Sequence, residues 1–496
     1  GAIVSSDMTH DSRSDTETGT SRPNFLVVMT DDQGPWALTR TMPELVTPTV
    51  DELVETGTIF DNFYCASPVC SPARASLLTG RMPSAHGVHD WLIPGEEQPD
   101  PHEEEYLGGL LTLPEVLHEA GYVCAMSGKW HVGTSRRPAP GFDFWYAHRK
   151  GGGPYFDAPI WDDHGNKRDE PRYFTDAVAD EACRFLDDYA SGNVAGRTTS
   201  NSPFYMQVNF TAPHHPWVGS HPQELCDLYS GCDFASVPRE PPHPWSKPRT
   251  EFYEAFDDPV PQLRGYAASL SGVDRALRLL LDKLDEHDLA SDTVIVYMAD
   301  NGFSCGHHGI WGKGNGTYPL NFWENSVRVP FIIRLPGQTE AREVSDHVSA
   351  TGFMSTICEL AGVDPADDPL RAGSSFANLA RSGVDDAKRE SVMVFDEYGG
   401  GRMVRSGDYK LIERYDGPGE LYHLGNDPEE RENLYGTATH AHMQNELHDR
   451  LREWFTHHET AADSAWAHDV QGWGQLVPLR RGYDDKHMYV HGLHLR

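Results

Sequence analysis

Phe25-Leu26-Val27-Val28-Met29-Thr30-Asp31-Asp32-Gln33 combines a continuous apolar run with an abrupt change to polar residues. Such a run is typical of a strand that is buried on both faces of a parallel sheet. Two carboxylates follow at the point where the strand ends. Open α/β sheets bind their ligands at the carboxyl ends of their strands. The segment therefore predicts a buried strand that carries functional side chains at its end.

Three further apolar runs have the same form, at residues 122–126, 204–210 and 293–299. Amphipathic helical patterns at 113–120 and 270–284 precede two of them. Each run ends in residues capable of chemistry, which are Lys129 and His131, His214 and His215, and Asp300 and Asn301. We therefore predict an α/β fold, a large and mostly parallel sheet between helices, in which these distant segments converge at one edge.

The character of the chain changes beyond about residue 375. Before this point, a further strand is expected at 331–335. Short strands separated by glycine-rich or Asp-Gly turns then follow at 391–397, 403–405, 409–414 and 420–423. A helical pattern at about 440–457 follows the last of them. This arrangement predicts a smaller C-terminal subdomain, an antiparallel sheet with one packing helix.

These patterns suggest four parts in the chain. Residues 1–21 are polar and read as a disordered lead-in or a remnant of cloning, and 22–375 as the catalytic domain. Residues 376–460 form the C-terminal α+β subdomain. The aromatic- and histidine-rich tail, 461–496, is expected to pack on the body or on a second subunit.

Composition excludes several classes of partner. The chain of 496 residues has 75 acidic and 41 basic side chains, a formal charge of −34, which argues against nucleic acid and an anionic membrane surface. No apolar stretch is long enough to span a bilayer. Eight cysteines do not make a disulfide framework, although Cys226 and Cys232 are close enough to bridge. We expect a cytoplasmic protein if Met8 is the natural start and an exported one otherwise; the oligomeric state stays open.

A second informative run is Cys70-Ser71-Pro72-Ala73-Arg74-Ala75-Ser76-Leu77-Leu78-Thr79-Gly80. Pro72 suits the start of a short helix, and Gly80 suits its end. Cys70 is then presented near a helix N-terminus, where negative charge is favoured, with Arg74 one turn away. Taken alone, Cys70 is equally consistent with a small buried hydrophobe or with a thiolate activated by the helix.

The Cys-x-Pro-x-Arg core with its Ala-Ser-Leu-Leu-Thr-Gly continuation resembles the signature of the type I sulfatases, in the alkaline phosphatase superfamily. The resemblance covers about residues 22–340 and extends more loosely to 460, where 419–422 and 426–428 are similar to the family's terminal domain. It implies an alkaline-phosphatase-like fold. It also implies that a formylglycine-generating enzyme oxidises Cys70 and that the resulting aldehyde hydrate is the nucleophile toward sulfur.

Asp31, Asp32, Asp300 and Asn301 provide carboxylate and amide oxygens of the kind that Ca²⁺ or Mg²⁺ prefers. The resemblance implies that they hold one divalent cation, usually calcium, and that formylglycine at position 70 is the fifth ligand. Asp300, beside the metal, is then placed to take the proton of the attacking hydroxyl.

The resemblance also implies roles for the basic residues. Lys129 and Lys313 are similar to the two sulfate-binding lysines and, with Arg74, would neutralise the oxygens of the ester. His131 matches the histidine that contacts the hydrate and assists its collapse. His214 matches the histidine at the ester oxygen, although the neighbouring His215 is an alternative.

The leading hypothesis is therefore a hydrolase of sulfate monoesters, most simply on a carbohydrate. One alternative is a phosphonate or phosphate diester hydrolase of the same superfamily, which Asn301 after Asp300 disfavours. Another is an inactive, glycan-binding relative with unmodified Cys70. Trp91, His215 and Trp217 are candidate substrate contacts, and Arg149-Lys150 before the glycine run 151–153 is a candidate basic rim on a mobile loop. His86 and His89 also fall in loops that could line the pocket.

Overall fold

The computed structural model describes residues 21–93, 104–247, 250–385, 391–468, 474–475 and 478–481. Its centre is an eight-stranded sheet with the order β15-β2-β14-β11-β1-β10-β4-β5. The strands are β1 (Asn24–Thr30), β2 (Thr58–Phe60), β4 (Val123–Gly128), β5 (Phe144–Ala147), β10 (Phe204–Asn209), β11 (Thr293–Ala299), β14 (Phe331–Arg334) and β15 (Arg342–Val344). Only β14 runs antiparallel to its neighbours in this sheet.

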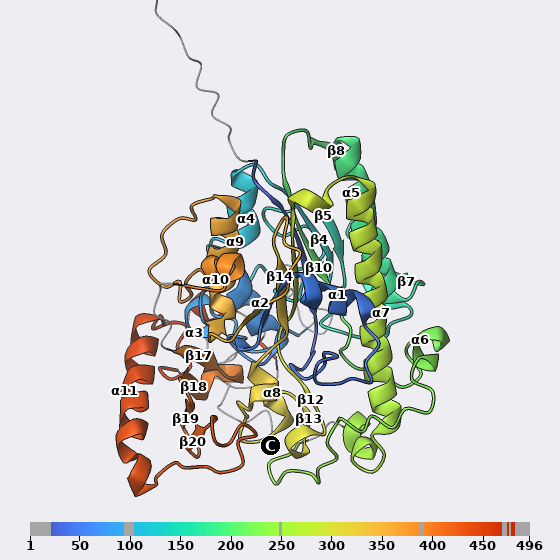
Figure 1. Ribbon diagram of the computed structural model, residues 1–496. Helices are drawn as coiled ribbons and strands as arrows, with labels where there is room; N and C mark the ends of the chain where they lie inside the picture. The colour runs from blue at the N-terminus through green and yellow to red at the C-terminus, as the bar shows by residue number, and fades with distance from the viewer. Residues whose placement is uncertain are drawn as a thin grey trace, which may run out of the picture.

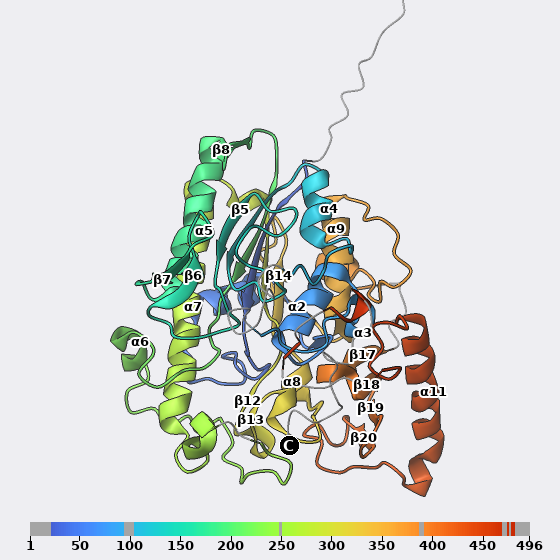
Figure 2. The same cartoon turned by 180° about the vertical axis from the view of Figure 1, so that it is seen from behind.

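Helices cover both faces of the sheet (Figures 1 and 2). One face carries α1 (Pro48–Thr56), α5 (Phe174–Ser191) and α7 (Val260–Glu286), and the other carries α2 (Cys70–Thr79), α4 (Leu113–Glu119) and α9 (Phe353–Ala361). Side chains alternate along β1: Leu26 and Val28 join the first core, and Val27 and Met29 join the second. This double burial is why the strand reads as a continuous apolar run.

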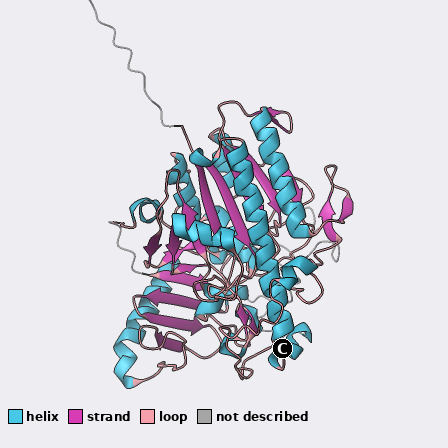
Figure 3. Cartoon of the chain, turned by 45° about the vertical axis from the view of Figure 1, so that its right-hand side comes forward, coloured by secondary structure: helices cyan, strands magenta, loops and turns pink. Residues whose placement is uncertain are grey.

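A separate four-stranded antiparallel sheet lies beside the body (Figure 3). It consists of β17 (Val392–Phe395), β18 (Gly401–Ser406), β19 (Tyr409–Arg414) and β20 (Glu420–His423), and α11 (Ala441–His457) packs on it. The mixed α/β fold with a small antiparallel C-terminal sheet is therefore confirmed. Lys410, buried on β19, pairs with Glu324 of the body at 3.0 Å and with Glu430 at 2.8 Å.

The described parts of the tail lie against the body. Gln475 bridges to Leu92 in parallel register, and its side-chain amide donates to the carbonyl of Gly87. The indole of Trp466 donates to the carbonyl of Gly399 at 2.5 Å. The other aromatic residues predicted to anchor this tail, Trp473, Tyr483 and Tyr489, lie outside the described residues.

Two further expectations can be compared with the structure. Cys226 and Cys232 are both free thiols. Among the described residues, no helix has the length and the hydrophobicity that a bilayer crossing requires.

Candidate active site

Four adjacent strands of the central sheet deliver polar side chains to the same edge, because β11, β1, β10 and β4 are neighbours and parallel. The residues that follow these strands are Asp300 and Asn301 after β11, Asp31 and Asp32 after β1, His214 after β10, and Lys129 and His131 after β4. The predicted convergence of these segments is confirmed. Lys313 reaches the same place from the loop after the short strand β13 (Trp311–Gly312).

Helix α2 presents position 70 to this edge. It begins at Cys70, two residues before the expected start, and ends at Thr79; the capping residue Gly80 has a left-handed φ of 71°. Every side chain of the helix is buried, so its position is fixed from all sides. Arg74, one turn after Cys70, donates from Nε and Nη2 to Oδ2 of Asp300 at 3.2 and 3.0 Å.

The Cys70 thiol is surrounded by charged groups. Its Sγ lies 3.3 Å from Oδ1 of Asp31, and Nζ of Lys313 donates to it at 3.2 Å. Burial, followed by the charge of Asp31, raises the pKa of Cys70 to about 12. These surroundings disfavour a helix-activated thiolate at an unmodified Cys70. The contacts of Cys70 with Asp31 and Lys313 also argue against the interpretation of this residue as a small buried hydrophobe.

Each of three clustered carboxylates has one cationic partner. Lys129 pairs with Asp31 at 2.5 Å, Lys313 with Asp32 at 2.6 Å, and Arg74 with Asp300. Burial and the neighbouring Asp300 raise the pKa of Asp31 to about 7, despite Lys129. Burial opposes ionisation of Asp32 too, but Lys313 and His214 hold its pKa well below its usual range. Charges of both signs, three carboxylates and three cations, are therefore concentrated around position 70.

The donor set fits a divalent cation. Ligand atoms of Asp31, Asp32 and Cys70 lie within 4.8 Å of one another. Among the described residues, Oδ1 of Asn301 is buried and accepts no hydrogen bond, which is costly unless a ligand completes it. Asp32 has a φ of 65°, a strained conformation of the kind found at functional sites. Hard oxygen donors of this type suit Ca²⁺ or Mg²⁺.

The structure also shows which carboxylate reaches position 70. We expected Asp300 to accept the proton of the attacking hydroxyl. Both oxygens of Asp300 instead accept hydrogen bonds from Arg74 and from the backbone N–H groups of Asp32 and Asn301. The carboxylate in contact with Cys70 is that of Asp31.

Two histidines and a glycine run line the pocket next to Cys70. Nε2 of His131 donates to the carbonyl of Leu92 at 3.0 Å, which leaves Nδ1 as a buried acceptor without a described partner. Nδ1 of His214 donates to the carbonyl of His215 at 2.6 Å, and its Nε2 lies 3.8 Å from Asp32. Burial is the main cause that lowers the pKa of both rings well below its ordinary value. Gly151 lies against the ring of His131, and Gly152 lies against the ring of His214.

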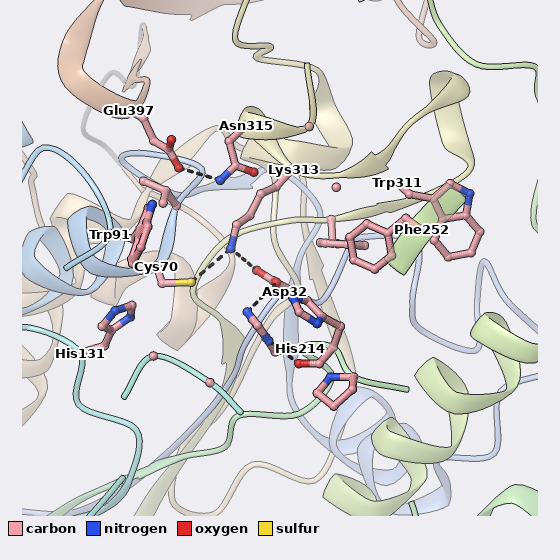
Figure 4. A pocket seen from close by; sticks show the side chains of 18 of the residues that line it. Asp32, Cys70, Trp91, His131, His214, Phe252, Trp311, Lys313, Asn315 and Glu397 are labelled. Carbon is pink, nitrogen blue, oxygen red and sulfur yellow. Dashed lines mark hydrogen bonds and ion pairs between the residues drawn. The ribbon is translucent and has the colours of Figure 1, made fainter. Parts of the chain in front are cut away.

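The pocket above Cys70 has a volume of about 430 Å³. Phe252, Phe303 and Trp311 line one side, and Trp91, Asn315 and Glu397 line another; Figure 4 shows Trp91 and Glu397 on the opposite side of Lys313 from Phe252 and Trp311. Asp32, Cys70, His131, His214 and Lys313 lie between them. The site is therefore a chamber with a charged centre and partly aromatic walls.

Some of the residues that line the pocket were predicted from the sequence, and others were not. Trp91, His215 and Lys150 line the pocket as expected, whereas Arg149, His86 and His89 are not among the described residues that line it. Trp217 requires a correction: its ring is 2% exposed, stacks on Phe252 and donates to the carbonyl of Pro213, so it supports the wall from behind. Residues missed from the sequence are Lys247, Phe252, Phe303, Trp311, Asn315 and Glu397. Asn315 could have been noticed beside Lys313, but nothing in the sequence marked Glu397.

Comparison with known proteins agrees with this geometry. The sulfatase family model matches residues 23–363, and a model described as N-sulphoglucosamine sulphohydrolase, C-terminal, matches residues 307–457. The chain is 28% identical over 459 residues to an ulvan-active sulfatase of Formosa agariphila, covering 87% of this chain and 81% of that protein. It is 27% identical over 512 residues to an N-acetylglucosamine-6-O-sulfatase of Bacteroides thetaiotaomicron, covering 88% and 86%.

A solved structure gives the same result. A protein in complex with its substrate D-glucosamine-2-N,6-O-disulfate superposes with a TM-score of 0.72 at 25% identity, covering 88% of this chain and 98% of that one. The match of the family model to most of the chain identifies the family. The chain belongs to the sulfatase family and is a sulfuric ester hydrolase.

Proposed function

We propose that this sulfatase hydrolyses a sulfate monoester of a carbohydrate, with formylglycine made from Cys70 as nucleophile and one calcium or magnesium ion as cofactor. Two relatives support the carbohydrate, since their names specify ulvan and N-acetylglucosamine 6-O-sulfate. The observation that carries the proposal is the placement of Cys70, 3.3 Å from Asp31 and 3.2 Å from Lys313 at the pocket.

The residues around position 70 fit both groups that the family implies. Asp31, Asp32, Asp300 and Asn301 would hold the cation, which when bound supplies positive charge to the oxygens of the ester. A formylglycine hydrate supplies a hydroxyl nucleophile and can later release sulfate by re-forming the aldehyde. The buried Nδ1 of His131 is an acceptor suited to a hydroxyl at position 70.

Fixed cations of the chain stabilise the charge of the ester. Nζ of Lys313 lies beside both Cys70 and Asp32, so it can donate to a sulfate oxygen placed above position 70. Lys129 and Arg74, which pair with Asp31 and Asp300, supply further positive charge to the site. One well-placed donor of this kind is worth about 3–4 kcal/mol of transition-state stabilisation.

His214 is positioned to handle the proton of the leaving alcohol. Because Nδ1 must donate to the carbonyl of His215, Nε2 is the nitrogen that takes up a proton. Burial keeps the pKa of the ring low in the empty pocket. Nε2 lies 3.8 Å from Asp32, at the centre of the site, and is the nitrogen that would hand a proton to the departing alcohol.

The proposal is tested by combining intact mass with sulfate release. The protein is produced with and without a formylglycine-generating enzyme, and the mass shows whether residue 70 is cysteine or formylglycine. We expect release of sulfate from sulfated sugars in proportion to the formylglycine fraction, and none from Cys70→Ala at an unchanged unfolding temperature.

Parallel assays separate the alternatives. Aryl phosphonate monoesters and phosphate diesters serve as counter-substrates, and faster turnover of these would assign the chain to the other branch of the superfamily. Sulfate release by Cys70→Ala, or an inert protein that carries formylglycine and bound metal, would show that the proposed function is wrong.

A further inference from the structure

Lys247 adds a cationic side chain to the pocket above Cys70. It lines the pocket and is exposed, and within the described part of the chain its side chain has no hydrogen bond or ion pair. A lysine ammonium group has three donors and no acceptor. Lys313, at the nucleophile, is by contrast buried and donates to Oδ1 of Asp32 and to Sγ of Cys70. The donors of Lys247 are therefore available to a ligand.

Backbone contacts fix the point from which this side chain starts. The N–H of Lys247 donates to the carbonyl of Gly316 at 2.8 Å, and the N–H of Tyr318 donates to the carbonyl of Trp245 at 2.9 Å. The residues between these two pairs form an antiparallel bridge. Gly316 is three residues after Lys313, so Lys247 is held against the loop that carries the lysine at the nucleophile.

The wall beside this point is aromatic. A Cβ atom at Gly316 would lie 3.7 Å from the carbonyl oxygen of Trp311, and the ring of Trp311 stacks on that of Phe252. Both rings line the pocket, and Figure 4 shows them on the same side of Lys313. Pockets of this kind hold the body of a ligand on apolar walls and orient it with a few polar groups. Aromatic rings with a cation beside them suit a sugar that carries an anionic substituent.

The charge of Lys247 is separate from the charges at the nucleophile. Lys313 lies within hydrogen-bond distance of Cys70 and pairs with Asp32, whereas Lys247 contacts neither of these residues in the described part of the chain. A scissile ester placed over Cys70 therefore engages Lys313 and leaves Lys247 for a different anionic group. Such a group is attracted here although the chain as a whole has a formal charge of −34.

We propose that Lys247 determines substrate specificity by binding a second anionic group of the saccharide, a sulfate or a carboxylate other than the scissile sulfate. The inference rests on the proposed function, because it takes the scissile sulfate to lie at Cys70 and Lys313. The enzyme then prefers sugars with two anionic groups to sugars that carry the scissile sulfate alone. Because Lys247 contacts a part of the substrate that does not react, its contribution falls mainly on KM.

The test measures kcat and KM of the matured wild-type enzyme and of Lys247→Met on four substrates: 4-nitrophenyl sulfate, a monosulfated N-acetylhexosamine, the same sugar with a second sulfate, and the monosulfated sugar linked to a uronic acid. Methionine keeps the apolar stem of the side chain and removes the charge. We expect kcat/KM on the two doubly charged sugars to fall about five- to tenfold relative to the monosulfated sugar. This factor lies between that of an exposed ion pair and that of a shielded hydrogen bond to a charged group.

The pattern of losses identifies the second group. A loss confined to the disulfate identifies a sulfate, a loss confined to the uronate identifies a carboxylate, and a loss on both shows that Lys247 binds either anion. Added salt should reduce the preference of the wild-type enzyme in the same direction as the substitution, because it screens exposed charges. If the aryl ester alone is turned over, the same ratios are taken from the inhibition constants of the sugars. An unchanged ratio between doubly and singly charged sugars would overturn the inference.

Further variants separate recognition from a general attraction of anions. Lys247→Arg keeps the charge and should retain most of the preference, whereas Lys247→Glu should reduce it further than Lys247→Met does. Lys283→Met is the matched control, since it removes the same charge at a position that pairs with Asp187 and Glu286 and is not among the lining residues. It should leave the substrate ratios unchanged. Equal losses on all four substrates in Lys247→Met would contradict the recognition of a second group.

The two proposals fail differently. A matured wild-type enzyme that releases sulfate from none of the four substrates contradicts the proposed function, and this inference falls with it. Sulfate release by wild type, with ratios that neither Lys247→Met nor Lys247→Glu alters, contradicts the role of Lys247 alone.

Discussion

Gly151 lies directly against the imidazole ring of His131, so closely that a Cβ atom at position 151 would come within 2.3 Å of Cε1 of that ring. The glycine run that looked like a mobile loop in the sequence is a wall of the active site. Gly151→Ala must therefore displace either the loop or His131. Since a displacement of about 1 Å in catalytic groups can cost roughly 100-fold in rate, we expect a loss of this order in kcat with a normal unfolding temperature.

Gly152→Ala provides the graded comparison. A Cβ atom there would lie 3.0 Å from Cε1 of His214, which requires only a small adjustment. The expected loss is about tenfold or less. Equal activities of wild type, Gly151→Ala and Gly152→Ala would show that the loop moves freely and that its glycines have no role in placing the histidines.

Metal content should depend on Asp32. Asparagine tolerates the left-handed backbone that Asp32 adopts, so Asp32→Asn removes a charge without adding strain. Removing a residue that only hydrogen-bonds to a metal ligand lowers metal affinity by about 10- to 100-fold. Removing the charge of a ligand itself should lower the affinity at least as much. Elemental analysis of purified protein and the calcium dependence of the unfolding temperature measure this. Asp187→Asn, in the acidic group with Glu286 and His287, is the control and should keep the metal.

Stability should depend on Lys410, which is fully buried between Glu324 and Glu430. Lys410→Met leaves the carboxylate of Glu430 without this cation, and breaking a buried pair costs about 3–5 kcal/mol in free energy of unfolding. Chemical denaturation measures the change. Arg452→Ala, which breaks an exposed pair with Glu413, should cost less than about 1 kcal/mol. Similar losses for both variants would argue against a special role of the buried cation.

The pH dependence of stability should change with Asp396. Burial raises the pKa of this carboxyl from 3.8 to about 8. Between these values the folded protein keeps a proton that the unfolded chain has released, so this group lowers stability as pH rises from about 4 to 8, and no further above it. Asp396→Asn keeps an oxygen for the N–H of Gly401 and removes the penalty.

The gain in stability of Asp396→Asn over wild type should therefore be small at pH 4, grow toward pH 8 and then level off. Its upper limit is about 6 kcal/mol, from 1.36 kcal/mol per unit of pKa over the shift from 3.8 to about 8. Urea titrations at several pH values measure it. A gain that is constant across this range would mean that Asp396 is already ionised in the folded protein.

The fold could be predicted wherever local sequence and tertiary environment agree. The strand at 293–299 has the expected bounds because an apolar run ends at Asp300, and the strands at 409–414 and 420–423 are bounded by turn residues. The helix of Cys70 began earlier than expected, because Pro72 is tolerated anywhere among the first helical N–H groups, which have no partner within the helix. Convergence of the strand ends followed from the parallel sheet alone.

The pocket wall could not be predicted in the same way. Glu397 reaches it only because the C-terminal sheet docks on the body through contacts such as that of Lys410 with Glu324. Trp217 was wrongly predicted to contact the substrate, because an indole in a loop can stack on a sugar ring. Its N–H instead finds a partner within its own segment, the carbonyl of Pro213, which allows the ring to be buried.

Helix α2 has no solvent-facing side, since all its side chains are buried. Any residue exchanged along it must fit a space already filled on every side, so efforts at laboratory evolution should leave it untouched. The adaptable positions are those that meet the chamber from separate parts of the chain, such as Trp91, Asn315 and Phe252. Libraries confined to these positions would allow selection of new ester specificities while the charged residues around position 70 stay unchanged.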